Sequence, residues 1–231
     1  VLYGYDDNAV WVVNNLHTPV SGAMVHVSVI NLDATEKFVK DASLDIAADS
    51  STQAIAIPKI DGLSPTYFVR MELRDSANQL LSGNFYWLST TPETLDWTKT
   101  NYFVTPVVQH ADLKALNDLP KVKLEATAHS TRSAREWSTR VSISNPSKTI
   151  AFAVELKLKD AKGEMIAPVL WQDNYFSLLP GEKRTITVRY AAQPSNEHAT
   201  VHVSGWNVES GAVKLTPGAS AGKAGEKLET K

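Results

Sequence analysis

The stretch Phe152-Ala-Val-Glu-Leu-Lys-Leu158 (FAVELKL) alternates large apolar residues with small or charged ones. Because successive side chains of a β-strand point to opposite faces of a sheet, this order gives a strand one apolar and one polar face. The same period of two recurs at residues 25–29, 69–73 and 186–188. Turn signals separate the runs, among them Asn-Asn at 14–15, Asp-Gly at 61–62, Asn-Pro at 145–146 and Pro-Gly at 180–181. Many short strands with turns at this spacing predict an all-β fold built from antiparallel β-sandwiches.

The chain also carries a weak internal repeat with an offset of about 130 residues, the scale of a duplicated domain. The repeated order is an asparagine, a loop, an alternating strand and an Asp-Ala pair, and it begins at Asn14 and again at Asn145. We therefore predict two immunoglobulin-like antiparallel β-sandwiches, at residues 1–90 and 120–214, joined by a partly helical connector.

The predicted connector comprises residues 91–119. Thr91-Pro92 and Leu119-Pro120 mark its ends, and residues 110–117 are expected to form one or two helical turns. A connector of this length is usually packed across its neighbours or functional, so we expect it to pack between the two domains. Residues 215–231 are small, polar and aperiodic, which predicts a flexible tail.

The composition narrows the class of partner. The chain has 231 residues, a formal net charge of −2 and no cysteine. This small negative net charge does not favour binding to nucleic acid or to an anionic membrane. No apolar run approaches the roughly 20 residues that span a bilayer. Without cysteine, disulfides and thiolate metal sites are excluded. The chain begins at Val1 as if inside a strand, so we expect a piece of a longer polypeptide.

No motif of a catalytic site is present. The sequence lacks GxSxG, HExxH, a glycine-rich phosphate loop and a metal-spaced histidine cluster. His26 and His202 fall on the polar phase of strands, where solvent-facing histidine is the simpler interpretation. The connector carboxylates Asp96 and Asp112 are the better acidic candidates, but sequence does not place them opposite each other. We predict no catalytic residue, no metal site and no cofactor.

The run from Asn84 to Trp97, NFYWLSTTPETLDW, is unusually aromatic. Consecutive aromatic residues at 85–87 put large rings on both faces of one strand, and runs that are apolar on both faces are usually covered on both. We therefore expect one phase to join the core of the first sandwich and the other to meet another domain. Four side chains are candidates for interdomain or sugar contact: Tyr86, Trp87, Trp97 and Tyr102.

One segment carries a more specific signal. Asp173 to Glu182, DNYFSLLPGE, is similar to the closing hairpin of the C-terminal immunoglobulin-like domain in family 2 glycoside hydrolases of the exo-β-D-glucosaminidase and β-mannosidase branch. The similarity extends to residues 31–37, 84–89, 95–97 and 105–112, which resemble exo-β-D-glucosaminidases more than β-mannosidases. It covers nearly the whole chain except the tail.

The resemblance implies a function. Enzymes of this branch place two immunoglobulin-like domains after a catalytic (β/α)8 barrel, and this chain resembles those two domains. It is then expected to be a non-catalytic region that packs against the barrel of a retaining glycosidase, which hydrolyses O-glycosyl bonds in chitosan oligosaccharides or mannosides. Such a parent would be periplasmic or extracellular. The alternatives are an independent carbohydrate-binding module and a cell-surface adhesion protein, the latter supported by fold class alone.

Overall fold

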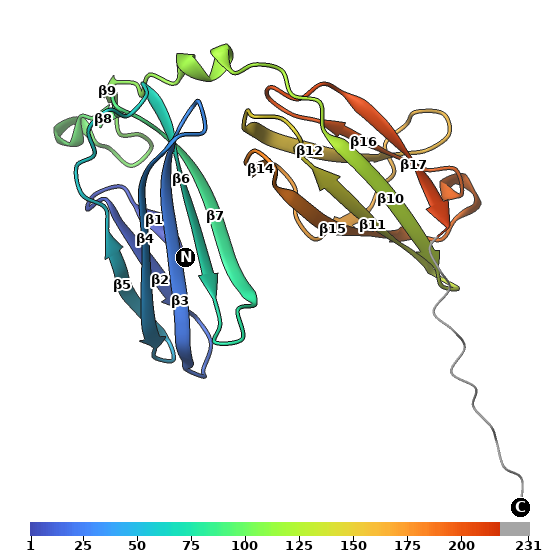
Figure 1. Ribbon diagram of the computed structural model, residues 1–231, viewed down its shortest axis with the longest axis horizontal. Helices are drawn as coiled ribbons and strands as arrows, with labels where there is room; N and C mark the ends of the chain where they lie inside the picture. Colours follow the sequence, from blue (N-terminus) through green and yellow to red (C-terminus); the bar gives the residue numbers. More distant parts are fainter. Residues whose placement is uncertain (218–231) are drawn as a thin grey trace, which may run out of the picture. The chain divides into compact units, whose positions relative to one another are not determined.

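The computed structural model describes residues 1–217, and these divide into two compact units, one of residues 1–120 and one that begins at Lys121. Each unit is a β-sandwich (Figure 1). The predicted flexible tail comprises residues 215–231, and its residues 218–231 lie outside the described part of the chain.

The first sandwich has two sheets. The smaller has the order β1-β2-β5 and the larger the order β4-β3-β6-β7. The strands of the smaller sheet are β1 (Leu2–Gly4), β2 (Ala9–Asn14) and β5 (Ser50–Ala56). Those of the larger sheet are β3 (Val20–Asn31), β4 (Glu36–Ile46), β6 (Thr66–Arg74) and β7 (Leu80–Ser89).

The alternating pattern produces the core of this sandwich. Val25, Val27 and Val29 are buried between the sheets. His26 lies on the opposite face of the strand, where its Nδ1 is 2.6 Å from Asp41 Oδ1 on β4. The period of two at residues 25–29 therefore predicted the buried face correctly.

The second sandwich forms one continuous set of paired strands in the order β13-β15-β11-β10-β17-β16-β12-β14. The strands are β10 (Glu125–Arg132), β11 (Glu136–Ser144), β12 (Ala151–Lys159), β13 (Val169–Trp171), β14 (Phe176–Leu178), β15 (Lys183–Ala191), β16 (Thr200–Ser204) and β17 (Gly211–Pro217). A 3-10 turn, η3 (Pro194–Asn196), precedes β16. The core of the second sandwich includes the apolar face of the FAVELKL strand, where Val154, Leu156 and Leu158 are buried.

The strand β17 extends into the segment that was predicted to be a flexible tail. β17 pairs antiparallel with β16 and in parallel with β10, so it links the two layers along one side (Figure 1). Leu215, Thr216 and Pro217, which the sequence assigned to the tail, thus belong to the sheet. Leu215 packs against the second core, and Thr216 Oγ1 donates to the carbonyl of Ala128 at 3.1 Å. Polar composition hid this strand because backbone pairing does not require apolar side chains at every position.

In the DNYF part of the signature, a side chain replaces backbone pairing between β12 and β14. β12 and β14 pair at Ala151 and Val154 with an irregular register, and β14 begins only at Phe176. Before Phe176, the side chain of Asn174 makes the hydrogen bonds to the backbone of β12 that a strand would otherwise make. Its Oδ1 accepts from the backbone N–H of Leu156 at 2.8 Å, and its Nδ2 donates to the Leu156 carbonyl at 2.9 Å.

The PGE part fixes the following turn. Gly181 has φ of 75°, a left-handed conformation that glycine adopts without strain. Its N–H donates to the carbonyl of Asn145 at 2.8 Å. Glu182 then closes the turn, because its carboxylate accepts from the N–H of Leu179 at 2.9 Å. The signature therefore has a structural role in the described part of the chain.

Candidate interaction surface on the connector hairpin

The connector folds as part of the first unit and contains a small hairpin. β8 (Thr94–Leu95) pairs antiparallel with β9 (Val107–Gln109), and a 3-10 turn, η1 (Trp97–Lys99), begins the loop between them. Gln109 Nε2 donates to the carbonyl of Pro92 at 2.9 Å, which closes the base. Residues 94–109 are called the connector hairpin below.

The base of the connector hairpin is tied to the larger sheet of the first sandwich. The carbonyl of Asp112 accepts from Ser89 Oγ at 2.8 Å and from Thr66 Oγ1 at 3.5 Å. A second 3-10 turn, η2 (Lys114–Asp118), follows; it buries Leu116 and contacts β6. This turn overlaps the segment expected to be helical, but as a 3-10 turn of five residues. The hairpin therefore projects from an anchored base.

Polar side chains organise the interior of the hairpin loop. Asp96 accepts from the backbone N–H of Thr98 at 3.2 Å, from Thr98 Oγ1 at 2.6 Å and from Lys99 Nζ at 2.8 Å. The bonds from Lys99, then from Thr98, hold the pKa of Asp96 below its usual value. Asn101 Oδ1 accepts from the N–H groups of Phe103 and Val104 at 2.9 and 3.2 Å. The loop backbone is thus held by its own polar groups.

The large apolar side chains of the connector hairpin are exposed. Trp97 is 71% exposed, Tyr102 95% and Phe103 90%, and Val104 and Val108 are also exposed. The rings of Tyr102 and Phe103 form an edge-to-face pair with centroids 5.2 Å apart. A loop that hydrogen-bonds inward and exposes a cluster of aromatic rings is typical of an interaction surface, because water solvates such rings poorly.

The four predicted contact residues separate into two places. Trp97 and Tyr102 both lie on the connector hairpin, whereas Tyr86 and Trp87 lie on β7. Tyr86 faces the first core and contacts the rings of Tyr3 and Tyr5, with centroids 5.7 and 5.9 Å away. Tyr86 is therefore a packing residue of its own sandwich.

Trp87 lies on the outer face of the same sheet and is 48% exposed. Its neighbour on that face, Phe85, packs on the buried ring of Phe68, with centroids 5.1 Å apart. The expected separation of the two phases is therefore observed, and a contact of Trp87 with another domain stays a prediction. Phe103 and Val104 were missed, although the run Tyr-Phe-Val between two polar residues in a loop was a usable signal.

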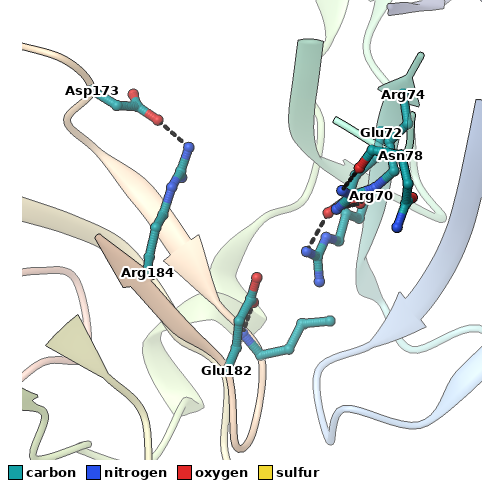
Figure 2. A network of polar contacts seen from close by, with 8 residues as sticks. Arg70, Glu72, Arg74, Asn78, Asp173, Glu182 and Arg184 are labelled. Carbon is teal, nitrogen blue, oxygen red and sulfur yellow. Dashed lines mark hydrogen bonds and ion pairs between the residues drawn. The ribbon is translucent and has the colours of Figure 1, made fainter. Parts of the chain in front are cut away.

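Two clusters of charged residues have structural roles (Figure 2). On β6, Glu72 lies between Arg70 and Arg74, with N–O distances of 2.5 and 2.7 Å. In the second sandwich, Asp173 of the signature pairs with Arg184 at 2.5 Å. Within residues 1–217 no group of three or more histidine, aspartate or glutamate side chains is placed to hold a metal ion. The same residues include no helix that is long and apolar enough to cross a membrane.

Comparison with protein families assigns both sandwiches. Residues 6–91 match the mannosidase Ig/CBM-like domain, and residues 102–208 match the exo-β-D-glucosaminidase Ig-fold domain. The chain is 42% identical over 214 residues to an exo-β-D-glucosaminidase of Streptomyces avermitilis, an alignment that covers 90% of this chain and 24% of that protein. The chain therefore comprises a mannosidase Ig/CBM-like domain and an exo-β-D-glucosaminidase Ig-fold domain.

A second exo-β-D-glucosaminidase and a crystal structure are also similar to this chain. The enzyme of Amycolatopsis orientalis is 37% identical over 213 residues, covering 90% of this chain and 21% of that protein. The crystal structure of the A. orientalis exo-chitosanase CsxA matches with a TM-score of 0.88 at 36% identity, over 92% of this chain and 26% of that chain. This chain thus spans about a quarter of the length of these relatives.

Proposed function

We propose that this chain is the accessory region of an exo-β-D-glucosaminidase that acts on chitosan-type oligosaccharides, and that it packs against the catalytic (β/α)8 barrel of the same polypeptide. The names of the relatives support the substrate class, and their greater length leaves room for a catalytic domain. The observation that carries the packing is the connector hairpin, whose aromatic side chains are exposed in this chain.

The hairpin is suited to docking on a preformed surface. Its backbone is fixed by Asp96 and Asn101, so little conformational freedom remains to be lost when the loop binds. Trp97, Tyr102 and Phe103 offer the large aromatic surface that is enriched at the centre of protein interfaces. The barrel is the proposed occupant because it belongs to the same polypeptide and is held at a high local concentration.

We propose that the parent is a retaining glycosidase that hydrolyses O-glycosyl bonds. A retaining mechanism uses two carboxyl groups about 5 Å apart, one as acid/base and one as nucleophile. In this proposal the barrel supplies both groups. A polymeric substrate that is degraded where it is found supports a periplasmic or extracellular location.

The test uses the full-length parent. Replacing Trp97 and Phe103 together by Ser should speed heat inactivation of the parent several-fold, because the docked face loses its apolar contacts. In the isolated chain the same double variant should unfold at the wild-type temperature. Leu16→Ser, at a loop residue that is 60% exposed outside the hairpin, is the matched control and should change neither. Equal inactivation of the double variant and the control would exclude docking through the hairpin.

The same exposed rings support one alternative, an independent carbohydrate-binding module. Indole and phenol rings stack on sugars, and Trp97 and Tyr102 are accessible. Titrating the isolated chain with glucosamine oligosaccharides and following tryptophan fluorescence separates the two functions. Saturable quenching at sub-millimolar sugar that Trp97→Ala abolishes would favour the binding module over docking. Fluorescence that does not change would favour docking.

A further inference from the structure

The first sandwich contains a cavity of about 270 Å³ at one end of its core, between its two sheets. Tyr3 lines it from the smaller sheet, and Val29, Tyr67 and Val69 line it from the larger sheet. The connection between β5 and β6, residues 57–63, forms the rim. Pockets for drug-sized ligands have volumes of about 300 to 1,000 Å³, so this cavity suits a smaller molecule.

The lining of the cavity combines buried valines with two tyrosines. Val29 and Val69 are each 1% exposed. Tyr3 donates its hydroxyl to Asn8 Oδ1 at 2.6 Å, and Asn8 also lines the cavity. Tyr67 is half-buried, and it also lines the cavity. A phenol that lines the cavity can donate a hydrogen bond to a ligand or accept one from it.

Both phenols are uncharged at neutral pH. Burial, followed by the nearby Tyr67, Tyr5 and Asp7, raises the pKa of Tyr3 to about 12, and burial also raises the pKa of Tyr67. Each hydroxyl can therefore both donate and accept. Lys59 at the rim adds a positive charge, which disfavours a cationic ligand.

We propose that this cavity binds one uncharged, polyhydroxylated ring the size of a single pyranose. The buried valines and the tyrosine rings would contact the C–H face of the ring, while Tyr67, Asn8 and Lys59 would bind its hydroxyl groups. Lys59 selects neutral sugars over sugars that carry an ammonium group. The site lies in the first sandwich and uses no residue of the connector hairpin, so it stands or falls independently of the proposed docking.

The test is a titration of the whole chain with N-acetyl-D-glucosamine and with D-mannose, followed by backbone amide NMR. Saturable shifts should appear at residues 57–69, with a dissociation constant of about 1–10 mM, as expected for so small a ligand. Tyr67→Phe keeps the ring and removes the hydroxyl, so it should weaken binding about fivefold. Tyr5→Phe removes an exposed phenol that does not line the cavity and should leave binding unchanged.

Charge reversal at the rim tests the selectivity. D-Glucosamine should bind the wild-type chain more weakly than N-acetyl-D-glucosamine, and Lys59→Glu should reverse this order. Equal binding of both sugars by Lys59→Glu would contradict the role of Lys59. The proposal is overturned if no saturable shift appears at residues 57–69 with any neutral sugar up to about 50 mM, or if Tyr67→Phe and Tyr5→Phe bind equally well.

Discussion

Asn14 and Asn145 make the same hydrogen bonds at equivalent corners of the two sandwiches. The Nδ2 group of each donates to the carbonyl four residues later and to a carbonyl 33 residues later, which is Ala47 for Asn14 and Leu178 for Asn145. The Oδ1 atom of each accepts from the backbone N–H two residues later. The asparagine that begins each copy of the weak repeat therefore marks a duplicated corner of the fold, whereas the Asp-Ala pairs at 33–34 and 160–161 fall at different positions of their turns.

A second pair of positions supports the duplication. At the end of β3, the N–H of Asn31 donates to the carbonyl four residues later, and its carbonyl accepts from the N–H of Ala34. At the end of β12, Asp160 and Gly163 make the same two bonds. Both turns place their fourth residue at positive φ, 68° at Ala34 and 85° at Gly163. The two sandwiches thus share the path of the chain into and out of the equivalent strands β3 and β12.

Asn145→Ala should destabilise the second domain by about 2–3 kcal/mol, because several buried carbonyls lose their donor at once. Asn145 is fully buried and also donates to the carbonyl of Leu179 at 3.3 Å. Urea unfolding followed by domain-resolved NMR signals measures the loss. Asn84→Ala removes one exposed bond to the Val1 carbonyl and should stay within about 0.5 kcal/mol of wild type. An Asn145 variant as stable as the Asn84 variant would refute the role of this corner.

Asn174→Ala should expose the backbone of Leu156 to exchange. The side chain of Asn174 bonds both the N–H and the carbonyl of Leu156, and no strand replaces it there, so we expect a loss of about 1–2 kcal/mol. Asn174→Asp keeps the acceptor for the Leu156 N–H but loses the donor, and should fall between Ala and wild type. Hydrogen exchange of the Leu156 amide measures the effect directly. Unchanged protection in Asn174→Ala would mean that another group caps this part of β12.

The ion pairs of Glu72 should make the first domain less stable in acid. Burial raises the pKa of Glu72, but the hydrogen bonds from Arg74 and the charge and hydrogen bond of Arg70 outweigh it, so the pKa lies below its ordinary value of 4.5. The folded state therefore binds the proton more weakly than the unfolded state. The resulting stability is present above the ordinary pKa and is lost as pH falls through the lowered one.

Glu72→Gln should accordingly flatten the fall in unfolding free energy of the first domain between about pH 6 and pH 3, and lower the stability at pH 7. Urea unfolding across this range measures both effects. Glu36→Gln, at an exposed residue of β4, is the control and should retain the wild-type slope. A Glu72→Gln slope as steep as that of the control would show that other carboxyl groups cause the acid sensitivity.

Trp87→Ala and Trp97→Ala should differ in the isolated chain. Trp87 is about half-buried on the outer face of β7, so its loss should cost roughly 1–2 kcal/mol, less than the 3–5 kcal/mol typical of a fully buried ring. Trp97 is 71% exposed and its loss should cost less than about 0.5 kcal/mol. Thermal unfolding of the two variants provides the measurement. A larger loss for Trp97 would mean that its ring supports the hairpin rather than an interface.

The aromatic run at 85–87 shows where sequence reasoning stops. Alternation predicted that the rings divide between two faces, but both phases are aromatic, so the sequence alone does not say which phase enters the core. Strand register decides it. Val69, a core residue of β6, lies opposite Tyr86, and Arg70, on the other face of β6, lies opposite Phe85. Register depends on a partner strand elsewhere in the chain, which period-two reading does not include.

The connector hairpin was harder to predict than the sandwiches. Its strands, β8 and β9, are short and separated by a long loop, so they leave no period to detect. The bonds that shape the loop are donated by nearby backbone N–H groups to the side chains of Asp96 and Asn101. Such local bonds favour turns in many sequences, and only the folded chain shows that they leave Trp97 and Phe103 outside.

The parallel pairing of β10 with β17 also has a mechanical consequence. Among residues 121–217 these are the first and last strands of the second domain, and Ala128 to Ser130 pair with Leu215 to Pro217. In the first sandwich, β1 and β7 lie in different sheets and form no such joint. Tension applied to the two ends of the second domain pulls paired, parallel strands past each other, so the hydrogen bonds between them share the load and must break together. Along its own chain axis, the second domain resists stretching by shear, whereas a seam loaded from one end would unzip one bond at a time.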